Sequence, residues 1–352
     1  MKTPLCDLQY SELEELVAAA GEPRYRAEQL CRHIVAYDGF EEYTDLPKSF
    51  IAKLRENYFD RPFIEKSRVV STDGATRYLF ETAEGDLVEA VFLPHGYGNS
   101  VCVSCQVGCA MGCTFCASGY YGFKRNLSAG EILAQALFIA RDKKDEGGVK
   151  KIVMMGSGEP LANYDNTVKF FKLLSSKKGL NIGMRSISIS TCGLPDKIER
   201  LARDGFSGTL SLSLHAATDE KRKKIMRVAN SHTVKDIVKS MRTFFDATRR
   251  RVVIEYILIA GFNDTDADVS ALKNLLRGLC CHVNLIPLNP TDHCDLKPPT
   301  KKQAYAFCAK LNDAKISATV RRSMGSDVAG ACGQLKNRTV EAEMVSKNLS
   351  KR

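Results

Sequence analysis

The chain has 352 residues, which is enough for one enzyme domain with a large hydrophobic core and a smaller appendage. Its 51 basic and 41 acidic side chains give a net charge of +10, which suits a polyanionic partner but equally a basic protein that binds none. No apolar run approaches the ~20 residues that span a bilayer, and the amino terminus lacks the pattern of an export signal. We therefore expect a cytoplasmic protein that is not inserted in a membrane.

The first part of the chain predicts a small helical module followed by a β-hairpin. Residues 13–58 carry short apolar periods of helical spacing, interrupted by Gly21, Pro23 and Pro47. Residues 67–93 alternate between apolar and polar side chains, and turns are expected at residues 73–74 and 84–85. This hairpin would link the helical module to the rest of the chain.

Beyond residue 100, short β-rich runs alternate with helical runs, which is typical of βα units around a parallel sheet. Helices are expected over residues 128–142, where Ser128 and Glu131 can form a capping box, and over residues 265–276. Six expected strands predict an α/β fold of the partial (β/α)6 barrel type, with its chemistry at the carboxyl ends of the strands. These strands are residues 101–104, 151–155, 185–190, 209–214, 251–258 and 283–288.

Three of the thirteen cysteines lie within eight residues, at Cys109, Cys113 and Cys116, directly after the first expected strand. Cysteines of a chain without an export signal should be reduced, so a cluster of them indicates metal or redox chemistry. Three thiolates would leave one iron of a 4Fe-4S cluster open for a substrate. A zinc site is the alternative, but structural zinc normally takes a fourth protein ligand, and no second Cys-x2-Cys pair is present.

Further polar and glycine-rich motifs follow the later strands. A Gly-rich turn at residues 156–160 lets backbone approach a ligand, and Glu159 could accept hydrogen bonds from an ammonium group. Each of the other strand-end residues could be an ordinary terminus, but the barrel would bring them to one rim. The residues expected to bind the cofactor are Gly158, Glu159, Ser190, Ser213, Leu214, His215 and Asn289.

Two more cysteines are candidates for chemistry. Cys332 is flanked by small residues that would let a bulky group approach its sulfur, although such a segment is also compatible with tight packing. Cys102 lies in the first expected strand, seven residues before Cys109, so the fold should bring it near the same opening. Cys105 is interpreted as an inert strand thiol rather than as an additional ligand.

The spacing of Cys109, Cys113 and Cys116 resembles that of the radical S-adenosylmethionine superfamily. Motifs at residues 101–109, 158–161, 213–215, 284–287 and 331–335 are further similar, in the same order, to the RlmN/Cfr family of radical methyltransferases that methylate ribosomal RNA adenosine. The similarity runs from Leu13 to Leu335 and includes the helical module. It implies a radical S-adenosylmethionine barrel with a 4Fe-4S cluster on the three cysteines.

The resemblance implies that two molecules of S-adenosylmethionine are used in each turnover. The first methylates Cys332, and the second is cleaved at the cluster to a 5′-deoxyadenosyl radical, which takes hydrogen from the S-methyl group. The methylene radical then adds to an adenine ring carbon. Cys102 would resolve the covalent RNA adduct and leave a transient disulfide with Cys332, and Glu89 matches the proposed proton acceptor. Because adenine C2 is electrophilic, a radical route avoids the unfavourable polarity of ordinary methyl transfer.

The implied substrate is C2 of an adenosine in 23S ribosomal RNA at the peptidyl-transferase centre, with an adenosine of the transfer RNA anticodon loop as a second substrate. The branch of the family that methylates C8 and confers antibiotic resistance has the same catalytic residues. Pro160, where that branch tends to carry alanine, favours C2. The resemblance also implies an electron donor such as flavodoxin or ferredoxin, and we expect the enzyme to be a monomer.

We expect four segments: a helical, RNA-binding accessory domain at residues 1–62, a β-hairpin linker or extension at 63–98, the radical S-adenosylmethionine barrel at 99–335 and a basic tail at 336–352. Basic residues that could contact RNA phosphates lie in several of these segments, although at least half of them are expected on solvated helix faces. They are Arg24, Arg26, Arg32, Lys124, Arg125, residues 221–224 and 249–251, Lys336 and Arg338.

Two hypotheses from other classes stay open on the sequence. A non-catalytic iron-sulfur or zinc protein could bind RNA through the basic surface, and it would function without Cys332. A radical enzyme could instead modify a protein or a small molecule, and it would form 5′-deoxyadenosine independently of RNA and of Cys332.

Overall fold

The computed structural model describes residues 2–120, 122–291 and 294–335, so the expected basic tail at 336–352 lies outside the described residues. A central sheet of ten strands runs through the molecule in the order β14-β13-β12-β11-β10-β9-β6-β5-β4-β3. The two end strands, β14 and β3, do not pair with each other, so the sheet stays open and the expected partial barrel is confirmed.

Seven neighbouring strands of this sheet pair in parallel, one more than the six predicted. The prediction missed β14, because three residues with one buried side chain give no recognisable apolar run. The parallel strands are β6 (Ser100–Cys102), β9 (Lys151–Met154), β10 (Ile187–Thr191), β11 (Thr209–Ser213), β12 (Val252–Leu258), β13 (Cys281–Pro287) and β14 (Ala318–Val320).

The segment predicted as a two-stranded hairpin forms three antiparallel strands, β3 (Phe63–Val70), β4 (Thr76–Thr82) and β5 (Leu87–Leu93). The two expected turns are present, and two turns join three strands. Because β5 pairs with β6, the segment is an extension of the central sheet. Val91 of β5 lies opposite Cys102 of β6, so this extension forms part of the surroundings of Cys102.

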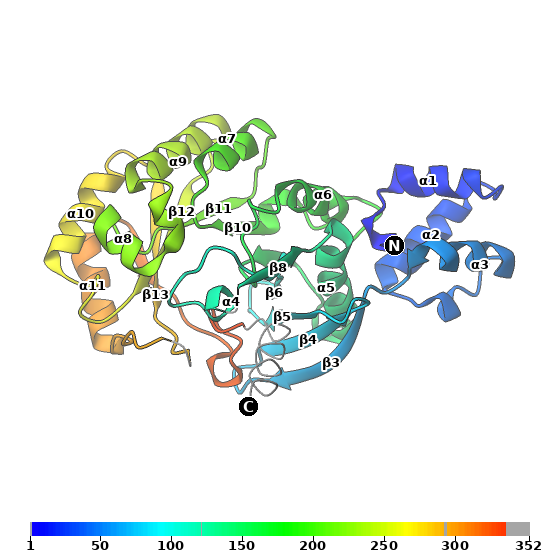
Figure 1. Ribbon diagram of the computed structural model, residues 1–352, viewed down its shortest axis with the longest axis horizontal. Coiled ribbons are helices and arrows are strands. Elements are labelled where there is room, and N and C mark those ends of the chain that lie inside the picture. Colours follow the sequence, from blue (N-terminus) through cyan, green and yellow to red (C-terminus); the bar gives the residue numbers. More distant parts are fainter. Residues whose placement is uncertain (1, 121, 292–293, 336–352) are drawn as a thin grey trace, which may run out of the picture.

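Helices cover the outer face of the parallel strands, as Figure 1 shows. The predicted capping box of α5 is confirmed, because Ser128 Oγ accepts from the Glu131 amide at 3.1 Å and the Glu131 carboxylate accepts from the Ser128 amide at 2.8 Å. The covering helices are α5 (Ala129–Asp142), α6 (Tyr164–Ser175), α7 (Pro195–Arg203), α8 (Asp219–Ile225), α9 (Val234–Thr248), α10 (Asp266–Leu276) and α11 (Lys301–Asp313). The short helix α4 (Ala117–Tyr120) directly follows Cys116.

The amino-terminal helices α1 (Tyr10–Ala19), α2 (Arg26–Ala36) and α3 (Lys48–Asn57) form a module to one side of the sheet (Figure 1). Strands β1 (Thr3–Pro4) and β2 (Tyr58–Phe59) pair in parallel and join its two ends. The module is anchored on α5, where the Asp7 carboxylate accepts a 2.6 Å hydrogen bond from the Gly130 amide. A Cβ at position 130 would lie 2.7 Å from the Asp7 nitrogen, so glycine permits this close approach.

Within the described ranges, no helix combines the length and the apolar character that crossing a membrane requires. The hydrophobic core lies between the central sheet and its covering helices and continues into the amino-terminal module.

Candidate functional site

The three clustered cysteines lie in the connection of a small antiparallel hairpin, between β7 (Gln106–Gly108) and β8 (Phe123–Asn126). The Cys109 amide donates a 2.9 Å hydrogen bond to the Gly122 carbonyl, which closes the base of this loop. The far side of the loop packs on the end of α8, where Thr114 N donates to Ile225 O at 3.0 Å and Cys113 forms a β-bridge with Met226. The loop is therefore fixed at both ends by backbone hydrogen bonds.

The three cysteines line one cavity, here called the cluster cavity, which encloses about 850 Å³ including its open mouth. Five of the seven residues predicted to bind the cofactor lie on its wall, and Leu214 and Asn289 do not. Leu214 is fully buried, and Asn289 lines a neighbouring cavity. The lining of the cluster cavity includes Cys109, Cys113, Cys116, Gly158, Glu159, Cys192, Ser190, Ser213, His215, Glu255 and Cys332.

The Gly-rich turn after β9 is shaped by the strand beside it. Gly158 has a φ of +107°, and a Cβ there would lie 2.7 Å from side-chain carbons of Gln106. Glu159 is held by backbone amides: Cys192 N donates to it at 2.7 Å and Leu161 N at 3.0 Å. Burial raises the pKa of the Glu159 carboxyl, and these hydrogen bonds oppose the rise. The carboxylate is thus oriented at the cavity wall, as an acceptor for an ammonium group must be.

The strand-end serines form a network that includes a residue no sequence motif indicated. Ser190 Oγ lies 3.0 Å from Ser213 Oγ and donates to Glu255 Oε2 at 3.0 Å. Glu255 is buried in the middle of β12 and lines the cluster cavity. A carboxylate in an otherwise apolar strand, residues 252–258, was a sequence signal that could have identified it.

His215 is a buried structural ring at the cavity wall rather than a proton donor. Its backbone has a φ of +59°, and its Nδ1 accepts a 3.0 Å hydrogen bond from the Ile257 amide. Burial, reinforced by the nearby Arg222 guanidinium, lowers the pKa of His215 to about 3. The ring is therefore neutral near pH 7.

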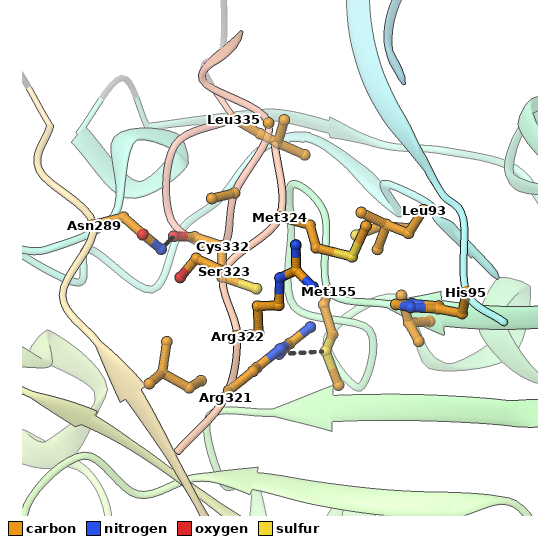
Figure 2. Close-up of a pocket in the computed structure, with 15 residues that line it drawn as sticks. Leu93, His95, Met155, Asn289, Arg321, Arg322, Ser323, Met324, Cys332 and Leu335 are labelled. Carbon is orange, nitrogen blue, oxygen red and sulfur yellow. Dashed lines mark hydrogen bonds between the residues drawn. The ribbon is translucent and has the colours of Figure 1, made fainter. Parts of the chain in front are cut away.

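A second cavity, here called the thiol cavity, is lined by Cys102 and Cys332. Figure 2 shows Cys332 in its wall. Both are free thiols in the structure. Burial raises the pKa of Cys102 to about 12, with a further contribution from Cys332, whereas Arg321 lowers it. Arg321, which the sequence did not single out, lies on the same wall and donates to the Met155 sulfur at 3.7 Å.

Cys332 belongs to the walls of both cavities, together with Met155 and Ile286. The loop that carries it is held by three hydrogen bonds, one from the segment after β13 and two from α4. Asn289 Nδ2 donates to the Cys332 carbonyl at 3.0 Å, Ala117 N donates to Gly333 O at 2.8 Å, and Ser118 Oγ donates to Leu335 O at 2.7 Å. The backbone of Cys332 is consequently fixed on the wall that the cavity of the cluster cysteines shares with the cavity of Cys102.

Glu89 and Cys105 do not lie on the wall that the two cavities share. Glu89 is buried on β5, pairs with Arg77 at 3.1 Å, and is absent from the described lining of both cavities. Its carbonyl accepts a 2.6 Å hydrogen bond from Ser104 Oγ. Cys105 is packed in the hydrophobic core against the Gly-rich turn, in the environment expected for an inert thiol.

The donor set of the cluster cavity fits an iron-sulfur cluster. No three His, Cys, Asp or Glu side chains in the described part of the chain converge on a position for one metal ion, but the cysteines of a 4Fe-4S cluster each bind a different iron. Burial raises the pKa of all three thiols, to about 12 for Cys109, so bound iron would have to replace the thiol protons. Beside them, Arg222 is fully buried with Nη1 unpartnered among the described residues, as expected where an anionic group belongs.

Many of the basic side chains that were candidates for RNA contacts form ion pairs with acidic side chains. This agrees with the alternative that they lie on solvated helix faces. The pairs include Arg24–Glu14, Arg32–Asp45, Arg125–Glu131, Lys221–Asp268 and Lys224–Glu220.

A different basic surface adjoins the thiol cavity. This basic hollow is lined by Lys151, Arg185, Arg321 and Arg322, and it includes Tyr97, which is 71% exposed.

Matches to known proteins extend over nearly the whole chain. Residues 103–272 match the family model of the Radical SAM superfamily, and residues 3–59 match the ribosomal RNA large subunit methyltransferase N-terminal domain. A probable dual-specificity RNA methyltransferase RlmN from Clostridium perfringens strain 13 is 43% identical over 342 residues, which cover 96% of this chain and 98% of that protein. A protein of the same description from Lachnoclostridium phytofermentans is 44% identical over 349 residues, or 97% and 98% of the two chains. The crystal structure of a radical SAM methyltransferase from Sphaerobacter thermophilus is 42% identical and matches with a TM-score of 0.92 over 95% of this chain and 99% of that one.

Proposed function

Because the chain belongs to the RlmN family of radical S-adenosylmethionine RNA methyltransferases, we propose that it methylates C2 of an adenosine in 23S ribosomal RNA and of an adenosine in a transfer RNA anticodon loop. The relatives are described as dual-specificity RNA methyltransferases, which supports two RNA substrates. An external one-electron donor such as flavodoxin or ferredoxin supplies the electron, and the enzyme works as a monomer.

The observation that carries this proposal is the position of Cys332 on the walls of both cavities. A methyl carrier has to meet the cofactor on one side and the RNA base on the other. The cluster cavity contains the three cysteines that hold the 4Fe-4S cluster, and the thiol cavity contains Cys102. Cys332 is the cysteine common to the two, so one sulfur can take part in both contacts.

When bound, the cluster and two molecules of S-adenosylmethionine supply a methyl group and a 5′-deoxyadenosyl radical. Cys332 carries the methyl group, and the hydrogen bond from Asn289 fixes its backbone. Glu159 orients the ammonium group of S-adenosylmethionine, while Ser190 and Ser213 contact its nucleoside part. Cys102 releases the methylated RNA: its sulfur bonds to the sulfur of Cys332 as the bond between that sulfur and the RNA-bound methylene breaks, and the methylene takes up the thiol proton to become a methyl group.

Glu89 is the proton acceptor in this proposal, although Arg77 holds its carboxylate at 3.1 Å. A Cβ built on Gly330 lies 3.7 Å from Arg77 Cβ, so the Arg77–Glu89 pair adjoins the loop of Cys332. Gly330 lines the thiol cavity, so the proposed base lies behind the wall of the cavity through which the adenine approaches.

The basic hollow supports entry of RNA from the thiol cavity side. It shares Arg321 and Arg322 with the thiol cavity, and its Tyr97 ring stacks on His95 with 4.9 Å between ring centres. Lysine and arginine neutralise phosphates, and exposed aromatic rings stack on unpaired bases. A flipped adenine would reach Cys332 through this side.

The product test uses anaerobically reconstituted protein with a 23S ribosomal RNA fragment or transfer RNA, followed by mass spectrometry of the RNA nucleosides. The expected product is 2-methyladenosine. Formation of 8-methyladenosine instead would overturn the C2 assignment, and 5′-deoxyadenosine formed equally well without RNA would contradict an RNA substrate.

Cys332→Ala tests whether Cys332 carries the methyl group, and Cys105→Ala is its control. Cys332→Ala should retain iron but lose both the S-methylcysteine peptide and the methylated nucleoside. Cys105→Ala removes a thiol of the core and should retain the product. Equal activity of the two variants would favour a non-catalytic RNA-binding protein. Cys102→Ala should accumulate RNA bound covalently to Cys332.

A further inference from the structure

Arg222 is a buried cation without an acidic partner among the described residues. Its side chain is 0% exposed, and its hydrogen bonds go to neutral backbone carbonyls. Nε donates to Leu214 O at 3.1 Å, and Nη2 donates to the carbonyls of Cys192 and Ser213. Nη1 has no partner in the described structure.

The guanidinium stays charged under all physiological conditions. A buried charge is strongly unfavourable unless an opposite charge compensates it. Asp219, on the same short helix α8, accepts a 2.7 Å hydrogen bond from the Val234 amide and forms no ion pair with Arg222 in the described structure. The charge of Asp219 acts on Arg222 from a distance, but no carboxylate of the described residues forms an ion pair with the guanidinium, which leaves room for an anion in the adjoining cluster cavity.

The cluster loop lies directly against the segment that carries Arg222. Arg222 O accepts from Met226 N at 2.8 Å, and Met226 forms the β-bridge with Cys113. Arg222 also binds the carbonyl of Cys192, which lines the cluster cavity beside Cys113. Arg222 is therefore joined by hydrogen bonds to both sides of the cluster cavity wall, through Met226 to Cys113 and directly to Cys192.

We propose that Arg222 is the counter-cation of the iron-sulfur cluster and that it sets the reduction potential of the cluster. Three thiolates give the cluster a net negative charge, and uptake of one electron from an external one-electron donor makes it more negative by one unit. A buried cation stabilises the reduced form more than the oxidised form. Arg222 thus makes the midpoint potential less negative, and it acts on the cluster rather than on the RNA.

The proposal rests on the cluster of the proposed function but not on its RNA product. It is tested on the full chain, reconstituted anaerobically and without RNA, by a redox titration followed by electron paramagnetic resonance. In Arg222→Gln, which keeps donor groups but removes the charge, the ratio of reduced to oxidised cluster at the wild-type midpoint should fall at least tenfold. This corresponds to a midpoint about 59 mV more negative for a one-electron couple.

Lys221→Gln is the matched control. It removes the same charge from the adjacent residue, but Lys221 Nζ is paired with Asp268 at 2.7 Å. Its ratio should change less than threefold. A tenfold change in Lys221→Gln would mean that the net charge of the helix, rather than Arg222, sets the potential, and this would overturn the proposal.

Arg222→Lys keeps the charge and should titrate within threefold of wild type. An Arg222→Gln protein that loads iron and titrates like wild type overturns the proposal. If Arg222→Gln does not fold, Arg222→Lys decides: a wild-type ratio supports the proposal and a tenfold fall overturns it. Wild-type protein that binds no iron would refute both proposals, whereas the expected shifts without any methyladenosine would refute only the proposed function.

Discussion

Asn289 Nδ2 donates a 3.0 Å hydrogen bond to the carbonyl oxygen of Cys332, and this bond links the segment after β13 to the loop between the two cavities (Figure 2). The sequence predicted Asn289 to be among the residues that bind the cofactor. In the structure its amide holds the backbone of the proposed methyl carrier, on the side of the thiol cavity. A residue that fixes Cys332 can influence both halves of the reaction.

Asn289→Ala should slow RNA methylation about 10-fold or more while iron content stays at the wild-type level, because one hydrogen bond to a partly buried carbonyl contributes about 1 to 2 kcal/mol. The measurement is the single-turnover rate of methyladenosine formation. Asn230→Ala is the control, since the exposed Asn230 side chain bonds only to the nearby Arg227 carbonyl among the described residues. Equal rates in the two variants would show that the Asn289 bond has no role in placing Cys332.

Ser118→Ala should loosen the loop of Cys332 without removing a ligand. Ser118 Oγ donates to Leu335 O at 2.7 Å and lies 2.8 Å from Ser157 Oγ, so the variant leaves the Leu335 carbonyl without this donor. Amide hydrogen exchange of residues 330–335 should become about 10-fold faster, as expected for the loss of ~1.4 kcal/mol. Ser231→Ala, at an exposed position, should leave this exchange unchanged. Unchanged exchange in both variants would contradict the anchoring role of Ser118.

Gly158→Ala should destabilise the protein and weaken binding of S-adenosylmethionine. The new Cβ would lie 2.7 Å from side-chain carbons of Gln106, and the alanine would have to keep the positive φ of the glycine. Together these effects should lower the free energy of unfolding by about 3 kcal/mol. Gly85→Ala separates the two effects, because Gly85 has a φ of +81° but no atom within 4 Å of the place that a Cβ would take, so its cost is about 1 kcal/mol. Urea unfolding measures the free energy of unfolding, and equilibrium dialysis measures the affinity for S-adenosylmethionine. Similar losses in both variants would show that the contact with Gln106 is unimportant.

His215→Gln should flatten the pH dependence of stability in acid. The unfolded imidazole takes up a proton below about pH 6.5, whereas the folded ring stays neutral down to its pKa of about 3. The unfolded state therefore binds more protons in this window, and stability falls as the pH drops from about 6.5, by at most ~1.4 kcal/mol per pH unit. Urea unfolding of the iron-free protein at several pH values measures the slope. A variant with the wild-type slope would show that His215 already titrates normally in the folded protein.

The parts of the site that depend on local spacing could be predicted from the amino-acid sequence alone. Cys109, Cys113 and Cys116 are close in the chain, so their common cavity follows from one short loop. Gly158, Glu159, Ser190, Ser213 and His215 could be predicted because the carboxyl ends of parallel strands meet at one edge of a sheet. The order of these motifs also indicated the family, which the comparisons confirm.

The folded arrangement was needed to establish which side chains face one another. Glu255, Arg321 and Arg222 have no local motif, and each gains its role from neighbours that are distant in the chain. Leu214 and Asn289 follow the carboxyl ends of their strands, but Leu214 is buried in the core and the Asn289 side chain bonds to Cys332. Covalent spacing restricts residues only over a few positions, whereas burial and charge pairing depend on which strands and loops become neighbours in the folded chain.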